Sequence, residues 1–198
     1  REVIMSKLYF RYGAMNCGKT TSLLQVAHNY EERGMKVVLI KPSIDTKAND
    51  SVSSRIGVER KVDHLVSPEE NLKGYLNLLI GNTSCVLVDE AQFLSESQVE
   101  ELFVFSKLTN IPVICFGLRC DFRTNLFPGS KRLFELADEI EELYTICRCG
   151  RKARFNARIV NGEFTLDGDQ VAIDGDVEYE SLCGKCYLTK VRKMKGWN

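Results

Sequence analysis

The residues Gly13–Thr20, with the sequence GAMNCGKT, most limit the folds open to this chain. They match G-x-x-x-x-G-K-[ST], follow a short β-type run at residues 7–12, and precede apolar residues at helical spacing over 23–30. Such a turn points backbone N–H groups at phosphate oxygens, and the helix adds its positive dipole end. We expect a nucleoside triphosphate here, with Lys19 at the β- and γ-phosphates and the Thr20 hydroxyl on Mg²⁺. The alternative is an ordinary glycine turn with a solvated lysine. The predicted triphosphate-binding residues are Gly13, Ala14, Met15, Asn16, Cys17, Gly18, Lys19, Thr20 and Thr21.

Strand and helix patterns alternate along the chain up to about residue 146. The strand-like runs are apolar at consecutive positions, which is typical of strands buried on both faces of a parallel sheet covered by helices. The sequence therefore predicts an α/β fold, with a P-loop NTPase-type parallel sheet and flanking helices. The predicted strands occupy residues 7–12, 35–41, 85–90, 111–117 and 143–146.

Three segments between these strands carry helix-start signals. Ser67–Glu70 and Ser95–Gln98 have the spacing of capping boxes, and Ser130 is placed to cap a helix through Ala137. Residues 43–66, by contrast, are polar and show no convincing period. We interpret residues 43–66 as a long loop.

The character of the sequence changes after residue 146. Two cysteine pairs flank a segment that has a hairpin signal at Asn161-Gly162 and glycine-punctuated short strands. Four thiolates at such spacing can surround one Zn²⁺, and a closed metal site would supply folding free energy to a region with little apolar material. A redox pair or unrelated buried thiols are the alternatives. We therefore predict a nucleotide-binding domain at residues 5–146 and a small zinc-ribbon-like β domain at 147–191, with structural zinc on Cys147, Cys149, Cys183 and Cys186.

Two acidic residues, Asp89 and Glu90, follow the apolar run 85–88. Sheets of this class place ligand chemistry at the carboxyl ends of their strands. Asp89 is therefore the expected second Mg²⁺ anchor beside Thr20, and Glu90 could activate a nucleophile. A strand end with two solvated acids is the alternative. These residues do not identify the group that accepts the phosphoryl group. Water as the acceptor would make the protein an ATPase, and a hydroxyl group would make it a kinase.

Charge and hydropathy argue against two classes of partner. The chain has 27 basic and 27 acidic residues, whereas a general polyanion binder is usually basic, so we expect no nucleic-acid partner. No apolar run approaches the roughly 20 residues that span a bilayer. With no visible secretory signal, we expect a cytoplasmic protein with no membrane partner. Eight cysteines in such a chain favour thiols and metal over disulfides, and Cys85, Cys115 and Cys120 are expected to be packing residues.

The chain resembles the thymidine kinases of the bacterial and animal cytosolic type from Leu8 to Tyr187. The specific parts of the resemblance are Asp45-Thr46, Asp89-Glu90-Ala91-Gln92-Phe93, Gly117-Leu118 with Phe122, the Phe127-Pro-Gly129 turn, and Tyr179 four residues before Cys183. Members of this family combine a P-loop α/β domain with a zinc-bearing second domain. They transfer the γ-phosphoryl of ATP to the 5′-hydroxyl of thymidine, and usually of deoxyuridine, which gives dTMP for nucleotide salvage. The resemblance also implies a homotetramer and raises feedback by thymidine triphosphate.

The resemblance implies a role for each matching residue. Glu90 is the implied general base, Lys19 the second catalytic residue, and Asp45, Asp89 and Gln92 complete the ATP-Mg site. A closing lasso loop at about residues 153–180 is expected to grip the base, although its composition would suit an ordinary hairpin loop equally. The chain departs from animal relatives at Lys47, where they carry Arg, and in its C-x-C pair. The implied substrate contacts are Met15, Phe93, Leu118, Phe122, Phe127, Val171, Ala172, Ile173, Asp174, Gly175 and Tyr179.

Two rival functions use the same motifs. Asp89–Gln92 resembles the DEAx box of helicase-like ATPases, but 198 residues can hardly hold the two motor domains that such proteins generally need. A zinc-ribbon binding module is the second rival, because basic residues crowd the first cysteine pair and could contact phosphates or form a solvated face. These basic residues are Arg148, Arg151, Lys152, Arg154 and Arg158.

Overall fold

The computed structural model describes residues 6–44, 50–54, 57–171 and 177–196. Its centre is a six-stranded sheet with the order β5-β2-β6-β7-β1-β8, and every neighbouring pair in it is parallel. The predicted parallel sheet is therefore confirmed. The strands are β1 (Leu8–Gly13), β2 (Val37–Pro42), β5 (His64–Val66), β6 (Cys85–Val88), β7 (Val113–Leu118) and β8 (Glu139–Glu142).

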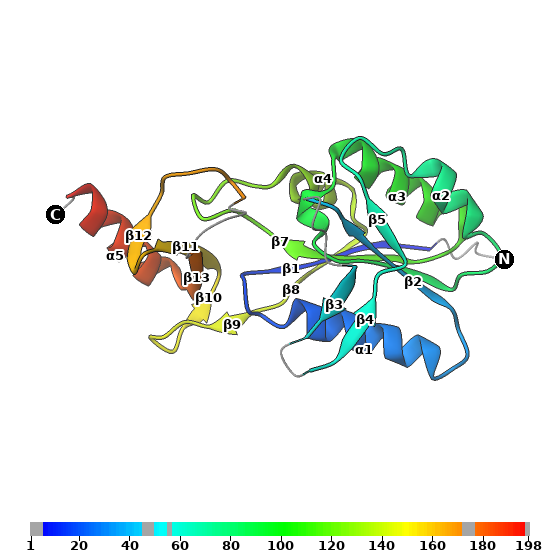
Figure 1. Cartoon of the computed structure of the whole chain (residues 1–198), viewed down its shortest axis with the longest axis horizontal. Helices are drawn as coiled ribbons and strands as arrows, with labels where there is room; N and C mark the ends of the chain where they lie inside the picture. The colour runs from blue at the N-terminus through cyan, green and yellow to red at the C-terminus, as the bar shows by residue number, and fades with distance from the viewer. Residues whose placement is uncertain (1–5, 45–49, 55–56, 172–176, 197–198) are drawn as a thin grey trace.

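Helices cover both faces of this sheet (Figure 1). Successive residues of β2 point to opposite faces, so Val37 and Leu39 pack in the core under α1, while Val38 and Ile40 pack in the core under α2, α3 and α4. This two-sided burial explains why the central strands are apolar at every position. The helices are α1 (Lys19–Glu31), α2 (Lys73–Leu78), α3 (Glu96–Thr109) and α4 (Pro128–Leu136), with a short 3₁₀ helix η1 (Ala91–Phe93) after β6.

The polar segment 43–66 is not the long loop that its composition predicts. It contains β5 and an antiparallel pair, β3 (Ser51–Ser53) and β4 (Glu59–Lys61). Val52 of β3 and Val62, which follows β4, pack into the core on the α1 side of the main sheet. Each of these strands has three residues, so no period of two could become visible in the sequence.

Two predicted helix starts are also wrong. The Ser67 N–H donates to Glu70 Oε2 at 3.0 Å, as in a capping box, but α2 begins only at Lys73. Gln98 Nε2 donates to the carbonyl oxygens of Ser67, Pro68 and Glu70, and these long-range bonds hold the segment against α3 in a non-helical turn. The capping box at Ser95–Gln98, where α3 begins, is confirmed.

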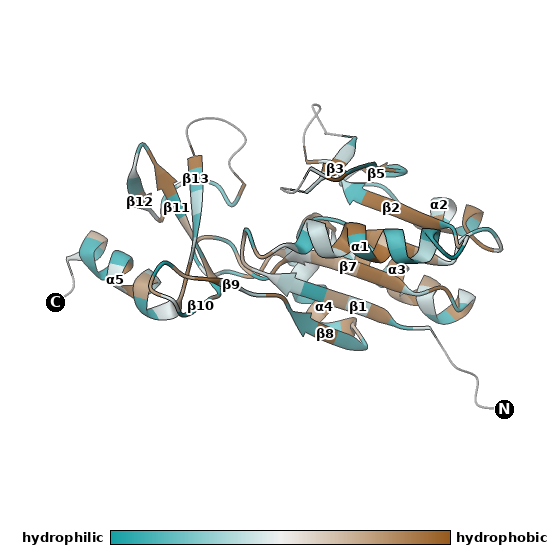
Figure 2. Ribbon diagram, turned by 90° about the horizontal axis from the view of Figure 1, so that it is seen from below, coloured by the Kyte–Doolittle hydropathy of each residue, from teal (hydrophilic) through white to brown (hydrophobic). Residues whose placement is uncertain are grey.

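Ser130 does not cap its helix. Phe127 occupies the N-cap position of α4, Pro128 starts the helix, and the buried Ser130 hydroxyl donates to the Leu118 carbonyl oxygen. The last predicted strand, residues 143–146, does not join this sheet: the strand beside β1 is β8, and within 143–146 only Thr145–Ile146 form a strand, which belongs to a separate two-stranded sheet. Its acidic sequence, EIEE, suits an exposed edge, where Arg11 of β1 pairs with Glu141 at 2.8 Å. Figure 2 shows this contrast between the hydrophilic β8 and the hydrophobic β2 and β7.

The C-terminal β region, residues 145–196, lies beyond the carboxyl ends of the main strands (Figure 2). It has a two-stranded sheet, β9 (Thr145–Ile146) with β10 (Lys152–Ala153), and a three-stranded sheet of β12 (Glu163–Thr165), β11 (Phe155–Val160) and β13 (Val177–Leu182). Helix α5 (Gly184–Lys195) packs Tyr187 and Val191 into a small separate core. Within the described ranges, no helix combines the length and apolar character needed to cross a bilayer.

Candidate active site

The phosphate loop joins the end of β1 to the start of α1 and needs its glycines. A Cβ atom at Gly13 would lie 2.3 Å from the Leu143 carbonyl oxygen and 2.4 Å from Cys17 Sγ. Gly18 caps α1 with φ +80°, a conformation that side chains with a Cβ rarely adopt. The loop and the first residues of α1 together line one concave surface.

This concave surface is a cavity of about 250 Å³, which we call the phosphate cavity after the ligand that the sequence predicts for it. Lys19 lies at its wall, where its Nζ donates to the Ala14 carbonyl oxygen at 2.6 Å and to Cys17 Sγ at 3.5 Å. Burial lowers the pKa of Lys19, while the charges of Cys17, Asp89 and Glu90 oppose that effect. Ser53 of β3 also lines the cavity and lies in the segment that the sequence suggested was a loop. The lining residues are Asn16, Cys17, Gly18, Lys19, Thr20, Thr21 and Ser53.

Asp89 and Glu90 directly follow β6, and their negative charges act to raise the pKa of Lys19. Asp89 is buried, and Glu90 adopts φ +50° at the start of η1, a left-handed conformation that costs a non-glycine residue about 1–2 kcal/mol. Burial raises the pKa of both carboxyls, and Lys41 is the strongest opposing charge for each. Sequence reasoning missed Lys41, although a lysine within the apolar run of β2 was a visible signal.

Gln92 does not line the phosphate cavity. Its side chain is buried, and its Oε1 accepts the Leu118 N–H at 3.0 Å. A Cβ at Gly117 would meet the same oxygen at 2.8 Å. Gln92 therefore ties η1 to the end of β7, which fixes the strand end that carries Leu118. This differs from the predicted cofactor contact.

A second cavity, of about 120 Å³, lies beside the phosphate loop, and we call it the nucleoside cavity after the ligand that the family resemblance predicts for it. Its lining includes every predicted substrate residue within the described ranges. Asp45 and residues 172–176, which include Ala172, Ile173, Asp174 and Gly175, lie outside the described residues. The predicted residues that line the nucleoside cavity are Met15, Phe93, Leu118, Phe122, Phe127, Val171 and Tyr179. The lining also includes four residues that belong to no motif identified in the sequence: Cys120, Asp121, Asn156 and Gln170.

Cys120 was expected to be a packing residue, and its place at the nucleoside cavity corrects that expectation. Cys85 and Cys115 are buried in the main sheet, as expected. Burial raises the pKa of Cys85 to about 12, so this thiol stays protonated at neutral pH.

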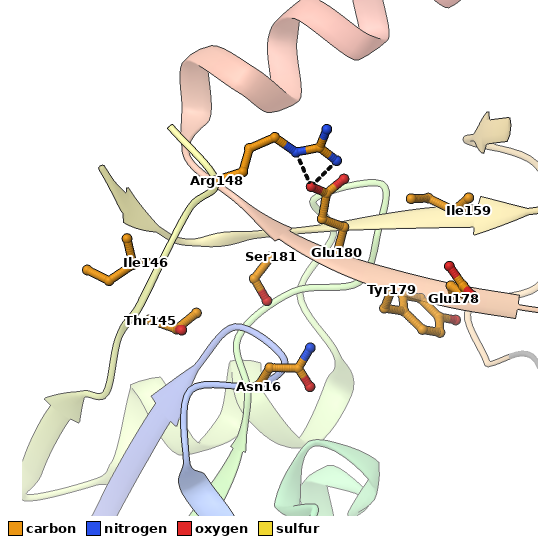
Figure 3. A pocket seen from close by; sticks show the side chains of 9 residues that line it. All are labelled: Asn16, Thr145, Ile146, Arg148, Ile159, Glu178, Tyr179, Glu180 and Ser181. Carbon is orange, nitrogen blue, oxygen red and sulfur yellow. Dashed lines mark hydrogen bonds and ion pairs between the residues drawn. The ribbon is translucent and has the colours of Figure 1, made fainter. Parts of the chain in front are cut away.

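Met15 connects the phosphate loop to the C-terminal β region. Asn156 Oδ1 of β11 accepts the Met15 N–H at 2.8 Å, while its Nδ2 donates to the Cys120 carbonyl oxygen at 3.1 Å. The Ser181 hydroxyl of β13 donates to the Met15 carbonyl oxygen at 2.5 Å. Figure 3 shows Ser181 and Tyr179 of β13 above Asn16 of the phosphate loop, around a third cavity of about 450 Å³. The backbone of Met15 is therefore held by two neighbouring strands of the C-terminal β region.

The four cysteines predicted as metal ligands come together from the β9–β10 connection and the start of α5. The Sγ atoms of Cys147, Cys149, Cys183 and Cys186 all lie within 4.8 Å of one another, and Cys149 and Cys183 are 3.5 Å apart. A tetrahedral ion with Zn–S distances of about 2.3 Å needs sulfur atoms roughly 3.8 Å apart, so the donor set and spacing fit Zn²⁺. Both residues of the C-x-C pair belong to the group.

Comparison with known proteins agrees with this arrangement. A model of the family described as "Thymidine kinase" matches residues 6–187. A thymidine kinase of Chromobacterium violaceum is 45% identical over 185 residues, which cover 92% of this chain and 98% of the relative. One from Legionella pneumophila strain Lens is 47% identical over 184 residues, covering 90% and 88%. One from Rhizobium meliloti is 44% identical over 195 residues, covering 96% and 100%. Similarity of this extent, from the phosphate loop through all four cysteines, shows that the chain belongs to the thymidine kinase family.

Proposed function

We propose that this protein transfers the γ-phosphoryl group of ATP to the 5′-hydroxyl of thymidine, and also of deoxyuridine. The observation that carries the proposal is the position of Met15, which belongs to the phosphate loop and lines the nucleoside cavity. An acceptor in that cavity therefore lies directly beside the phosphate cavity, as phosphoryl transfer requires.

Glu90 is the proposed general base. Its carboxylate must accept the proton of the 5′-hydroxyl, and a buried carboxyl with a raised pKa accepts a proton more readily than a solvated one. Lys41 and Lys19 oppose the shift, because their positive charges favour the deprotonated form that a general base requires. Lys19, held at the wall of the phosphate cavity, is proposed to neutralise charge on the transferred group.

Two metals complete the proposal. Thr20 and Asp89 would hold Mg²⁺, which would neutralise negative charge on the phosphates. Cys147, Cys149, Cys183 and Cys186 would hold structural Zn²⁺, which stabilises a region whose own apolar core is small. The division into domains at residues 5–146 and 147–191 belongs to the same proposal. The homotetramer and feedback by thymidine triphosphate stay predictions that size-exclusion chromatography and inhibition assays can test.

A nucleoside panel with γ-labelled ATP tests the proposed function. We expect label in the 5′-monophosphates of thymidine and deoxyuridine, identified by chromatography, and little in products from purine nucleosides. Release of the label as inorganic phosphate at the same rate with and without nucleosides would favour the ATPase alternative and refute the kinase.

A further inference from the structure

Arg158 of β11 is buried beside the nucleoside cavity. Arg158 is 2% exposed, and no other lysine or arginine in the described ranges is buried. The sequence placed it with four other basic residues in a cluster that suggested a solvated face or a phosphate contact. The structure separates it from the ion pairs of that cluster, such as Arg148 with Glu180 and Lys152 with Glu142.

The partners of the Arg158 guanidinium are neutral oxygens and aromatic rings. Nε and Nη2 donate to the Tyr179 hydroxyl at 3.0 and 2.8 Å, Nη1 donates to the Asp169 carbonyl oxygen at 2.7 Å, and Nη2 donates to the Gln170 carbonyl oxygen at 3.2 Å. Its Cζ lies 3.6 Å from the centre of the Phe122 ring. No carboxylate of the described residues forms an ion pair with this group, so the buried cation depends on these hydrogen bonds and on the ring face.

Three of these partners, Phe122, Gln170 and Tyr179, line the nucleoside cavity. They come from three separate places: the segment after β7, the segment between β12 and β13, and β13 itself. Gln170 is held a second time, because its Nε2 donates to Asp121 Oδ2 at 3.2 Å. The chain passes close to the guanidinium at Gly168, where φ is +100° and a Cβ would lie 3.2 Å from Nη1. One side chain therefore fixes three parts of the cavity wall relative to one another.

We propose that Arg158 is a positioning residue that sets the shape of the nucleoside cavity and thereby the affinity for the nucleoside. The inference rests on the proposed function, because it takes that cavity as the acceptor site. Arg158 acts through Phe122, Gln170 and Tyr179 and makes no direct contact with the reacting groups. A planar fork with five donors is needed for this geometry, and the single ammonium of lysine cannot reproduce it.

The test is steady-state kinetics with Arg158→Lys. We expect the KM for thymidine to rise about tenfold or more, because several hydrogen bonds to a charged donor are lost. The KM for ATP should stay within about twofold of the wild type, since Arg158 does not line the phosphate cavity. The matched control is Arg154→Lys, which changes an exposed arginine that pairs with Glu142 at 3.2 Å and should leave both constants unchanged.

A merely structural role would lower the amount of active enzyme and leave both KM values unchanged. That result, or a thymidine KM within twofold of the wild type in folded Arg158→Lys, would overturn the inference. If Arg158→Lys does not fold, Tyr179→Phe decides, because it removes only the hydroxyl that accepts two of the guanidinium N–H groups. A selective rise in the thymidine KM supports the inference, and an unchanged value overturns it. Wild-type enzyme that phosphorylates no nucleoside would instead refute the proposed function.

Discussion

Replacing Glu90 with glutamine should separate the proposed general base from a structural carboxyl. Glutamine has nearly the same shape and keeps the backbone at φ +50°, so the phosphate cavity, which Glu90 does not line, should keep its affinity for ATP. A positioned base contributes roughly 10²–10⁴-fold to the rate. We therefore expect kcat to fall at least about a hundredfold, which corresponds to roughly 2.7 kcal/mol of transition-state stabilisation.

The same substitution should stabilise the folded protein at neutral pH. Burial and the neighbouring Asp89 charge raise the pKa of Glu90, with burial the larger cause. A carboxyl whose pKa is higher in the folded state stabilises the fold most below its unfolded-state pKa, and this contribution is lost as the pH rises through the folded-state pKa. At pH 7, above the ordinary carboxyl pKa, this contribution is reduced in the wild type, whereas glutamine does not titrate. We expect Glu90→Gln to unfold at a higher temperature at pH 7, with the difference shrinking toward acidic pH.

The assay combines kinetics, ATP titration and thermal unfolding at several pH values. The acid limb of kcat in the wild type should lie above the ordinary carboxyl pKa of about 4.3, and Glu90→Gln should lose that limb. The control is Glu96→Gln, which removes an exposed carboxylate that pairs with Lys131 at 3.8 Å and should change none of these quantities. An unchanged kcat would remove Glu90 from the role of base. Loss of activity together with a lower unfolding temperature would refute the reasoning from burial.

The remaining predictions concern Lys19 of the phosphate loop, the four clustered cysteines, and Asn156 of β11. Lys19→Ala should abolish phosphoryl transfer while thymidine still binds in calorimetry, because Lys19 does not line the nucleoside cavity; near-normal turnover would contradict the phosphate-loop assignment. Metal analysis should find one zinc per chain on the four cysteines, and a metal-free, fully active preparation would disprove a structural site. Asn156→Leu should destabilise the protein by about 2–4 kcal/mol in urea unfolding, because it leaves the Met15 N–H and the Cys120 carbonyl oxygen without their partner.

The sequence predicted those features whose cause is local. The phosphate loop, the buried parallel strands and the Ser95–Gln98 capping box each depend on residues within a few positions of one another. The failures have a common physical reason. Ser67–Glu70 has the spacing of a capping box, but its carbonyl oxygens are bound by Gln98, which lies far along the chain and holds the segment against α3. The edge strand β8 was missed because it is exposed and acidic, so it has no apolar pattern.

The residues that line the nucleoside cavity were likewise only partly predictable from the sequence. The aromatic and apolar residues Phe93, Phe122 and Tyr179 could be named from motif resemblance, and they do line one cavity. Asn156 and Gln170 could not, because their positions depend on how β11 and the segment before β13 meet the end of β7. Periodicity and spacing describe single elements and contain no information about which distant elements will touch.

The contacts of Met15 connect the C-terminal β region to the loop that we propose binds the phosphates, as well as to the proposed nucleoside site. Asn156 and Ser181 hold the two backbone polar groups of Met15, and their strands β11 and β13 are paired along their whole length. Leu182 and Cys183, at the end of β13, pack in the small core that also contains Cys147. The proposed metal site, the β11–β13 pair and the phosphate loop thus form one continuous series of contacts. Loss of the metal should therefore displace the loop that holds the phosphates and weaken ATP binding before the main sheet unfolds.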